Sequence, residues 1–494
     1  MTRRARLANA FTRPRSFAFW LGAITVGALV LRLAYVIWYE NTHYGPAGDA
    51  FYYHYQANAI AKGYWFIEPY QWQCFGIKAQ SAAHPPLYSL YLSVFSVFGG
   101  TTTLVHRIAT AFVGAGTVWF VGAAGREMRS ERVGLAAAGI AAIYPTLWIN
   151  DGLLMSETIF AFTIALLTWL SYRYIRNPTR GTALWIGFAL ALTALARAEA
   201  LMLVVLLVIP LLLFYGRDRA ARRERLLRVG AACVVTVLTC APLVVHNFAR
   251  FDQPVYLSTG LGSVLGVANC PETYDGGFLG LWRPNCVSRV DNLAAGRPAN
   301  AEPERDGKVG AAACLRFPDG KDKKLGDESD IEKIRRKAST KFIGKHLDRL
   351  PTVIGARLGR TFEVYRAAQG IVYADFVENR GTVASQAARW SFYVLALLSI
   401  AGAVMLKRRK VALLPCGAML AGAVLTTILT YGNVRFRIQL DVVLPMLAAV
   451  PLLAGLDRWR ERRALARDRK RTDVPFDEPG DVVPVGEGGP TSAR

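Results

Sequence analysis

Long apolar blocks separated by short charged loops dominate the sequence. A helix rises ~1.5 Å per residue and must cover about 30 Å of hydrocarbon to cross a bilayer, which takes roughly 20 residues. We therefore expect about ten transmembrane helices, at 17–38, 105–124, 133–148, 158–175, 181–196, 199–215, 229–247, 388–406, 411–430 and 438–456. The predicted fold class is an all-α polytopic membrane protein.

One apolar stretch, 86–98, is too short to cross the bilayer. Its 13 residues would cover only about 20 Å as a helix. We expect a juxtamembrane helix in the first outer loop that begins after Pro85 and Pro86 and ends at Gly99 and Gly100. A helix lying flat here keeps the basic loop 125–132 in the cytoplasm, where the positive-inside rule places Lys and Arg.

The predicted helices divide the chain into five parts. These are a cytoplasmic basic N-terminus (1–16), a membrane module (17–247) with outer loops at 39–103 and 149–157, an α-containing extracytoplasmic loop domain (248–387), C-terminal transmembrane helices (388–456) and a largely disordered cytoplasmic tail (457–494). Within the loop domain, 295–330 is expected to be a flexible charged loop. The stretch 331–347 is expected to be an amphipathic basic helix, on anionic lipid or on the membrane domain.

Composition agrees with a membrane protein. Hydrophobic residues make up 53% of the chain, and the mean hydropathy is +0.24. The formal net charge of +23 comes from 59 Lys and Arg against 36 Asp and Glu. Because the basic clusters fall between apolar blocks, the positive-inside rule explains the charge, and we expect no nucleic-acid partner.

The seven cysteines lack the spacing of a metal site. No CxxC or paired Cys/His motif occurs, so structural zinc is not expected. Cys74, Cys270, Cys286 and Cys314 lie in segments predicted outside the cytoplasm, where disulfides can persist. One or two disulfides are possible among these four, and the sequence leaves their pairing open.

Charged side chains collect on the outer surface in the predicted topology. They are Asp49, His84, Glu157, Arg197, Glu199, Arg435 and Arg437. Short outer loops are normally poor in arginine, and a planar guanidinium suits phosphate oxygens, so the three arginines favour an anion-binding site. Carboxylates at the edge of a bilayer are costly and usually functional, which makes Asp49 and Glu157 candidate catalytic groups.

Simpler explanations exist for each residue taken alone. Asp49 can be a turn residue or the cap of the helix that begins near Ala50, and Asp151 is a competing carboxylate near Glu157. His84 can be an ordinary surface histidine, and arginines at span ends commonly snorkel to lipid head groups. The aromatic run at 51–55 is more typical of an interfacial belt than of a sugar platform.

Four short motifs occur in an order that resembles one enzyme class. They are Gly48-Asp49-Ala50, His84-Pro85-Pro86-Leu87-Tyr88, Tyr144-Pro145 followed by Ser156-Glu157, and Leu195-Ala196-Arg197-Ala198-Glu199. This order is similar to that of the GT-C glycosyltransferases, nearest to the branch of protein O-mannosyltransferases and lipid A aminoarabinose transferases. The resemblance covers 17–215 well, extends more weakly to the turn near Arg435, and matches 248–385 in position only.

The resemblance implies transfer of a sugar from a polyprenyl-phosphate carrier to a lipid, glycan or protein acceptor, with inversion, at the outer face of the cell membrane. Asp49 stands at the position of the general base and Glu157 at that of a second carboxylate. His84 stands where relatives often have Lys or Arg, so it contributes a charge only when protonated.

The remaining roles follow the same resemblance. Donor phosphate binding falls to His84, Arg197, Arg435 and Arg437, and possible substrate contacts are Tyr53, Tyr88 and Glu199. A divalent cation is a possible cofactor because some relatives hold one. The two carboxylates alone are too few to assign metal ligands, so no metal site is expected.

Two other classes of function stay open from the sequence. Many spans and intramembrane charges also suit a transporter or flippase for a polyprenyl-linked or anionic substrate, although we find no repeated halves and no paired broken helices. A scaffold whose outer domain binds a wall polymer is the third possibility. The sequence does not identify the sugar, the acceptor or the oligomeric state.

Overall fold

The computed structural model describes residues 16–40, 46, 48–215, 221–309, 312–317 and 325–472. These residues are mostly helical, with one two-stranded sheet among them, and the expected all-α polytopic class is confirmed. The predicted basic N-terminus, apart from Ser16, and the tail from 473 onward lie outside the described residues. Internal contacts divide the chain into one compact unit up to Pro451 and a second from Leu452, and the candidate site lies in the first.

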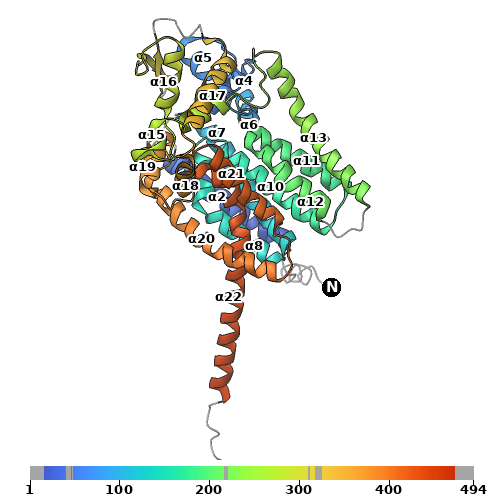
Figure 1. Ribbon diagram of the computed structural model, residues 1–494. Coiled ribbons are helices and arrows are strands. Elements are labelled where there is room, and N and C mark those ends of the chain that lie inside the picture. The colour runs from blue at the N-terminus through green and yellow to red at the C-terminus, as the bar shows by residue number, and fades with distance from the viewer. Residues whose placement is uncertain are drawn as a thin grey trace, which may run out of the picture. The chain divides into compact units, whose positions relative to one another are not determined.

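The membrane helices follow the predicted spans. They are α2 (Phe17–Tyr35), η1 (Val36–Glu40), α7 (Thr103–Met128), α8 (Glu131–Ile143), α9 (Pro145–Gly152), α10 (Glu157–Arg176), α11 (Arg180–Ala196), η2 (Ala198–Met202), η3 (Val204–Val208), α12 (Ile209–Phe214), α13 (Arg222–Phe248), α20 (Thr382–Arg408), α21 (Leu414–Leu429), η6 (Val434–Arg437) and α22 (Ile438–Thr472). Helix α10 packs between α7 and α11, and α11 packs on α13 (Figure 1).

The number of crossings stays a prediction. Among the described helices, six are long and apolar enough to cross a membrane, and the bent pair α8 and α9 would make a seventh. The other three predicted spans coincide with shorter apolar helices, at Arg180–Ala196, Ala198–Phe214 and Leu414–Leu429.

The predicted span 133–148 is not one straight helix. Helix α8 ends at Ile143, and α9 continues after it at an angle of 48°. Pro145 has no backbone N–H, and its ring would clash with the preceding turn, so a straight helix cannot pass through it. The break places Asn150 and Asp151 on α9, inside the expected outer loop 149–157.

The first outer loop contains the expected juxtamembrane helices, α4 (Asp49–Ala61), α5 (Pro69–Phe75) and α6 (Leu87–Val97). Helix α6 has 11 residues and falls among the helices too short to span a membrane. It buries Tyr88 and Leu92 and packs on α4 and α7. Gly99 follows it with a φ of +88°, a left-handed conformation that glycine adopts without strain and that ends the helix.

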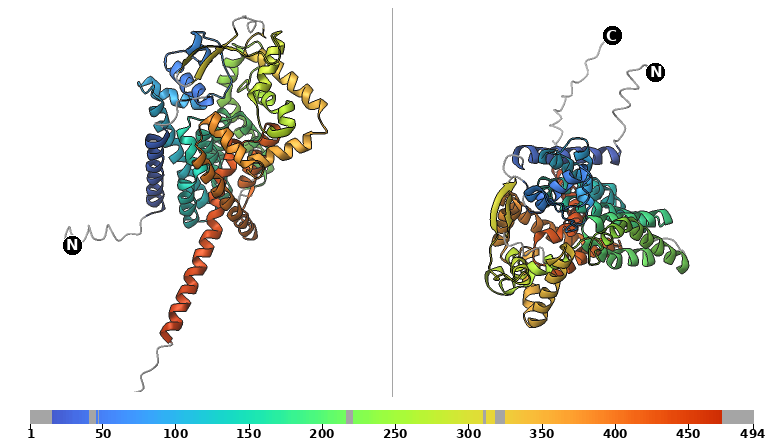
Figure 2. Two further views of the ribbon diagram at one scale, coloured as in Figure 1. Left: turned by 90° about the vertical axis from the view of Figure 1, so that its left-hand side faces the viewer. Right: turned by 90° about the horizontal axis from the view of Figure 1, so that it is seen from above.

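The described part of the loop domain consists of helices and one hairpin. Its elements are α14 (Leu261–Ala268), α15 (Pro271–Tyr274), η4 (Gly276–Phe278), α16 (Pro284–Ala294), β1 (Glu304–Val309), β2 (Ala312–Arg316), α17 (Glu328–Lys345), α18 (Leu350–Thr361) and α19 (Ala367–Glu378). Helices α4, α5, α16 and α17 gather at one end of the membrane helices, at the top of Figure 1 and of the left view of Figure 2. The loop domain therefore covers the end at which α4 begins.

One expectation for the loop domain needs correction. The predicted charged loop 295–330 contains the antiparallel hairpin β1–β2, which the pattern missed because β1 is exposed up to its last residue and shows no apolar alternation. Tyr70 stabilises the hairpin, since its hydroxyl donates to Ala313 O at 2.6 Å. The predicted amphipathic helix exists as α17 and packs on α14 and α16 of the loop domain, while its expected contact with anionic lipid stays a prediction.

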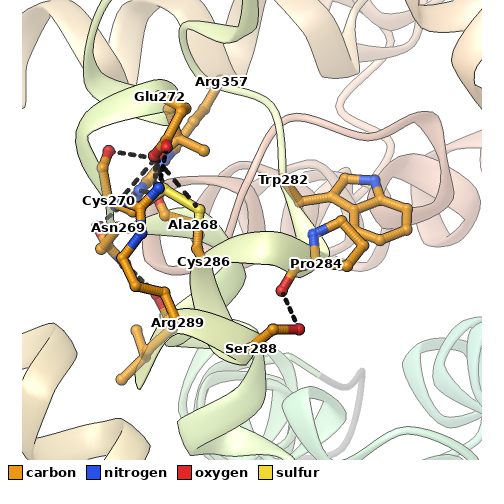
Figure 3. Close-up of a disulfide and its surroundings, with 12 residues drawn as sticks. Ala268, Asn269, Cys270, Glu272, Trp282, Pro284, Cys286, Ser288, Arg289 and Arg357 are labelled. Atoms are coloured by element: carbon orange, nitrogen blue, oxygen red, sulfur yellow. Dashed lines mark hydrogen bonds and ion pairs between the residues drawn. A yellow bond between two sulfur atoms is a disulfide. The ribbon is translucent and has the colours of Figure 1, made fainter. Parts of the chain in front are cut away.

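Two disulfides resolve the pairing that the sequence left open. Cys74 in α5 is bonded to Cys314 in β2, 240 residues away, so the first outer loop is tied to the loop domain. Cys270 and Cys286 join the start of α15 to α16, beside the ion pair between Glu272 and Arg289 (Figure 3). The free cysteines of the described chain are Cys233, Cys240 and Cys416.

We expect three thiols to react with maleimide in denatured, unreduced protein, and all seven cysteines to react after reduction. The double variant Cys74→Ser/Cys314→Ser should melt at a lower temperature. The lost disulfide closes a long loop, and such a bond contributes about 2–4 kcal/mol to the free energy of unfolding. Cys233→Ser, which removes a free thiol, is the control. Peptide mass spectrometry that finds Cys74 linked to Cys270 or Cys286 would contradict this arrangement.

Candidate functional site

One arginine, Arg435, contacts three carboxylates from distant parts of the chain. Its Nη2 lies 2.8 Å from Asp49 Oδ2, its Nη1 lies 3.3 Å from Glu378 Oε1, and its Nε donates to Glu157 Oε1. Asp49 begins α4, Glu157 begins α10 and Glu378 ends α19. Three helix ends therefore meet at one guanidinium, and Asp49 and Glu157 lie in one site, as the predicted topology requires. We call these four residues the Arg435 cluster.

The Asp49 side chain is not used to cap α4. The N-cap is Gly48, which has a φ of +54° and makes no side-chain cap hydrogen bond. Glycine suits this position because it adopts positive φ without strain. The carboxylate of Asp49 is therefore available to the site, and 30% of the side chain is exposed.

Arg197 adds a second cation at Glu157. Its Nη1 lies 2.6 Å from Glu157 Oε1, and its Nε lies 2.6 Å from Glu199 Oε1. Arg197 follows α11 directly in an extended conformation, which separates it from the helix and turns the chain into η2. Glu157 is fully buried, and its second oxygen, Oε2, has no hydrogen-bond partner.

His84 stands beside Asp49 as an uncharged ring. Its Nε2 lies 3.7 Å from Asp49 Oδ1, and the ring packs on Tyr52 and Tyr53 with centroids 4.8 and 5.0 Å away. Burial lowers the pKa of His84, and this effect outweighs the charge of Asp49, which raises it. At neutral pH His84 is therefore a hydrogen-bonding group and not a permanent cation.

Asp49 is held in its charged form. Burial raises its pKa, but the positive charge of Arg435 and the hydrogen bond from the same side chain outweigh burial and lower the pKa to about 2. Asp49 is consequently ionised throughout the physiological pH range.

Arg437 and Asp151 belong to separate networks. Arg437 lies 2.7 Å from Glu363 Oε2 and 3.2 Å from Asp441 Oδ2, and its side chain is 1% exposed. Asp151 lies 2.7 Å from Arg32 Nε, with both side chains fully buried. The competing carboxylate is thus outside the Arg435 cluster, and the predicted phosphate contact of Arg437 stays untested.

The other predicted substrate contacts lie at different depths. Tyr53 and Tyr88 are buried and pack on each other with ring centroids 5.1 Å apart, and the Tyr88 hydroxyl lies 2.7 Å from Thr110 Oγ1. Glu199 is 25% exposed and pairs with Arg197. Tyr53 of α4 and Tyr88 of α6 therefore join these two helices in the interior, whereas Glu199 is partly exposed.

Glu378 and Arg380 are members of the site that sequence reasoning missed. Arg380 donates through Nε to Glu378 and through Nη1 to Asn150 Oδ1 at 3.2 Å, which links α19 to α9. Asn379 lies between Glu378 and Arg380 and has a φ of 56°, and Gly381 follows Arg380 with a φ of 69°. The sequence did contain a signal for these residues. The Glu-Asn-Arg-Gly turn places an arginine in a predicted outer segment directly before an apolar span, where arginine is normally scarce, as it does at Arg197.

A cleft adjoins the cluster on the side of Glu378. It encloses about 770 Å³ of empty space, part of it open to solvent, and residues of α9, α18, α19 and α20 line it together with the turn at 432–434. Glu378 belongs both to the cleft and to the Arg435 cluster. We call this space the α19 cleft.

Groups that could hold a metal ion lie elsewhere among the described residues. One is Cys270, Glu272 and Cys286, whose cysteines form a disulfide, and the other is Asp252, Asp327 and Asp330 in the loop domain. Asp49 and Glu157 both contact the Arg435 guanidinium, so a divalent cation between them would have to displace it.

Comparison with known families supports the resemblance. Residues 83–246 match the sequence model of the dolichyl-phosphate-mannose-protein mannosyltransferase family. The match includes His84, Glu157 and Arg197 but neither Asp49 nor Arg435. The resemblance to GT-C class glycosyltransferases is confirmed for this part of the chain. No curated protein matches the sequence.

Several solved structures are similar to the chain at low identity. The archaeal oligosaccharyltransferase AglB from Archaeoglobus fulgidus, in complex with an inhibitory peptide and a dolichol-phosphate, has 14% identity and a TM-score of 0.47, covering 91% of this chain and 52% of its own. ArnT from Cupriavidus metallidurans bound to undecaprenyl phosphate has 14% identity and a TM-score of 0.41, covering 89% of this chain and 79% of its own. The chain spans about half the length of the oligosaccharyltransferase.

Arg435→Gln should destabilise the protein by about 3–5 kcal/mol, because it leaves three carboxylates without their shared cation. Arg180→Gln, which breaks the exposed pair with Glu224, should change the stability far less, because solvent screens this pair, and it is the control. Thermal melting of the solubilised variants measures both.

The loss from Arg435→Gln should shrink when the pH falls from 7 to 5. Without the arginine, burial raises the pKa of Asp49, so protonation in this window relieves the repulsion, whereas wild-type Asp49 with its pKa of about 2 does not titrate there. An equal loss at both pH values would contradict the assignment of Arg435 as the shared counter-ion.

Proposed function

We propose that the protein is a membrane glycosyltransferase that moves a sugar from a polyprenyl-phosphate carrier to a lipid, glycan or protein acceptor of the cell envelope. The observation that carries this proposal is the contact of Arg435 with Asp49 and Glu157, which unites the candidate base, the second carboxylate and a cation. The family match over residues 83–246 supports the class of reaction.

In the proposed reaction, Asp49 accepts the proton of the acceptor hydroxyl or amine. The acceptor atom attacks the anomeric carbon on the face opposite the phosphate, the bond from that carbon to the phosphate oxygen breaks, and polyprenyl phosphate leaves with the electron pair. The sugar configuration is inverted. Arg435 and Arg197 stabilise the negative charge that grows on the departing phosphate.

The pairing of Asp49 with Arg435 makes the basicity of Asp49 depend on whether a donor is bound. A carboxylate with a pKa of about 2 is a weak base, and it stays so while Arg435 donates to it. A donor phosphate that draws Arg435 toward itself would raise the pKa of Asp49. The base is then strongest when a donor is present, which limits unproductive proton transfer.

Glu157 and His84 have supporting roles in this proposal. Glu157 holds both Arg197 and Arg435 through Oε1, so it orients these two cations. His84 is uncharged, so it contributes a hydrogen bond to the donor phosphate in place of a full charge.

We further propose that the site faces away from the cytoplasm, with both termini inside. Cys74 is in the same outer loop as Asp49 and is disulfide-bonded to the loop domain. Disulfides persist in oxidising compartments and are rare in the cytosol, which supports this orientation. We name only the class of sugar donor and acceptor, because the residues of the Arg435 cluster do not select one sugar or one acceptor over another.

Asp49→Asn should lower the turnover rate of sugar transfer by about 100- to 10,000-fold, the usual contribution of a general base. Transfer from a radiolabelled polyprenyl-phosphate sugar to envelope acceptors by the purified protein measures it. Glu127→Gln is the control, since Glu127 pairs with Arg176 at the opposite end of α10 and its loss should leave the rate unchanged.

A wild-type rate in Asp49→Asn would rule out the assigned base. Movement of the lipid carrier across liposomes without sugar transfer by the wild-type protein would instead favour a flippase.

A further inference from the structure

Four polar side chains form a closed ring of hydrogen bonds between α4, α6 and α7 (Figure 1). His54 Nδ1 lies 3.0 Å from His106 Nδ1, and His106 Nε2 lies 2.9 Å from Ser96 Oγ. Ser96 Oγ lies 2.8 Å from Asn58 Oδ1, and Asn58 Nδ2 lies 3.4 Å from His54 Nε2, which closes the ring. His54 and His106 are 4% and 0% exposed. We call these four residues the histidine ring.

The position of every proton in the ring follows from one neighbour. The carbonyl oxygen of Thr101 can only accept, and it lies 3.0 Å from Asn58, so the atom of Asn58 that faces it is Nδ2. Asn58 Nδ2 therefore also donates to His54 Nε2, and the proton of a neutral His54 is on Nδ1. His54 Nδ1 donates to His106 Nδ1, so the proton of His106 is on Nε2 and faces Ser96. The Ser96 hydroxyl completes the ring by donating to Asn58 Oδ1.

A further proton has no place in this arrangement. The two ring nitrogens that accept are His54 Nε2 and His106 Nδ1, and a proton on either would point at an N–H that already donates to it. The pKa of His54 is lowered to about 3, by burial first and then by the positive charges of His106 and Arg107. His54 is therefore neutral at pH 7, and its protonation breaks the ring.

The surroundings of the ring do not compensate a positive charge. Within one helical turn of a ring residue along the chain, the charged and titratable side chains are tyrosines and cations, namely Tyr52, Tyr53, Tyr55, Lys62 and Arg107. Helix α5, which packs on α4, adds Tyr70 and no charged residue. On α9 and α10, which pack on α7, the acids Asp151 and Glu157 are paired with arginines. An imidazolium in the ring would thus have no carboxylate of its own among these neighbours.

The ring holds the helix on which the candidate base lies. Helix α4 starts at Asp49, and His54 and Asn58 are four residues apart on one side of it. Their partners are Ser96 near the end of α6 and His106 in the first turn of α7, so the ring joins α4 to a membrane helix. Because α4 is a single helix of 13 residues, a displacement at His54 also displaces Asp49.

We propose that the histidine ring is a proton-operated latch, which holds α4 on α7 at neutral pH and releases it in acid. Release moves Asp49 out of its contact with Arg435. The latch follows from the ring alone, whereas the effect of its opening on sugar transfer rests on the proposed function. Histidine suits such a device because its charge changes close to physiological pH.

The pH window of the latch follows from the two states of His54. In the closed latch its pKa is about 3, and in the released helix it returns toward the ordinary value of 6.5. The stability that the neutral ring contributes is therefore fully present above about pH 6.5 and is lost as the pH falls toward 3. Between pH 7 and pH 5, the equilibrium constant for opening should rise by about 10- to 30-fold through His54.

Hydrogen exchange of backbone amides measures the opening without sugar transfer. In the solubilised wild-type protein, the protection factors of the α4 amides should fall by about 10- to 30-fold from pH 7 to pH 5, after correction for the pH dependence of the intrinsic exchange rate. The amides of α10, which contains no histidine, are the internal reference. His346→Gln is the matched control, because His346 lies after α17 in the loop domain and should leave the fall unchanged.

Two variants of the ring separate the latch from a purely structural contact. Asn58→Asp keeps the shape of the side chain and gives a protonated His54 a carboxylate, so it raises the pKa of His54 and should make the fall in α4 protection at least about 10-fold smaller. His54→Phe removes the titrating group and should reduce the fall by the same factor, at a lower protection at both pH values. If His54→Phe does not fold, Asn58→Asp alone decides.

The outcomes distinguish the latch from the proposed function. Unchanged α4 protection in the wild type from pH 7 to pH 5, or an equal fall in the wild type and Asn58→Asp, would overturn the latch. Where both proposals hold, sugar transfer by the wild type slows reversibly in the same window, and Asn58→Asp keeps more of its rate at pH 5. If α4 is released as expected but the wild type transfers no sugar at any pH, the proposed function fails and the latch stands. Transfer at full rate after release would overturn the link between the latch and Asp49.

Discussion

The site depends on one shared counter-ion. Asp49, Glu157 and Glu378 converge within reach of a single guanidinium, and without Arg435 three negative charges would be crowded together with little water to screen them. The same contact has a chemical consequence, because it keeps Asp49 ionised and weakly basic. Architecture and reactivity are thus set by the same bonds, and a ligand that competes for Arg435 changes both.

Much of the arrangement followed from simple rules on hydrophobic length and charge. The short stretch before Gly99 was recognised as too short to cross, and this put Asp49 and Glu157 on the same side. Arginines in the predicted outer loops are exceptions to the positive-inside rule, and two of them, Arg197 and Arg435, do contact the candidate carboxylates. These rules work because burying charge in lipid is costly enough to leave a signal in the sequence.

Other features had no local signal. Arg435 and Arg437 are two residues apart on a tight turn, where side chains point in different directions, so one joins the cluster and the other joins Glu363 and Asp441. Three buried donors of the α19 cleft, Trp282 Nε1, Arg360 Nη1 and Arg380 Nη2, come from three separate segments, and their lack of acceptors is a property of the folded state. The hairpin at 304–316 is held by Tyr70 and a disulfide from far away, not by its own pattern.

The distance along the chain between partners has a consequence for biogenesis. Helices enter a membrane in order of synthesis, so Asp49 and Glu157 are inserted long before Arg435 is made. During that interval Asp49 lacks its arginine partner, and the partner of Cys74 in the disulfide lies 240 residues downstream. The Arg435 cluster is therefore completed only after the last part of the membrane domain has been made.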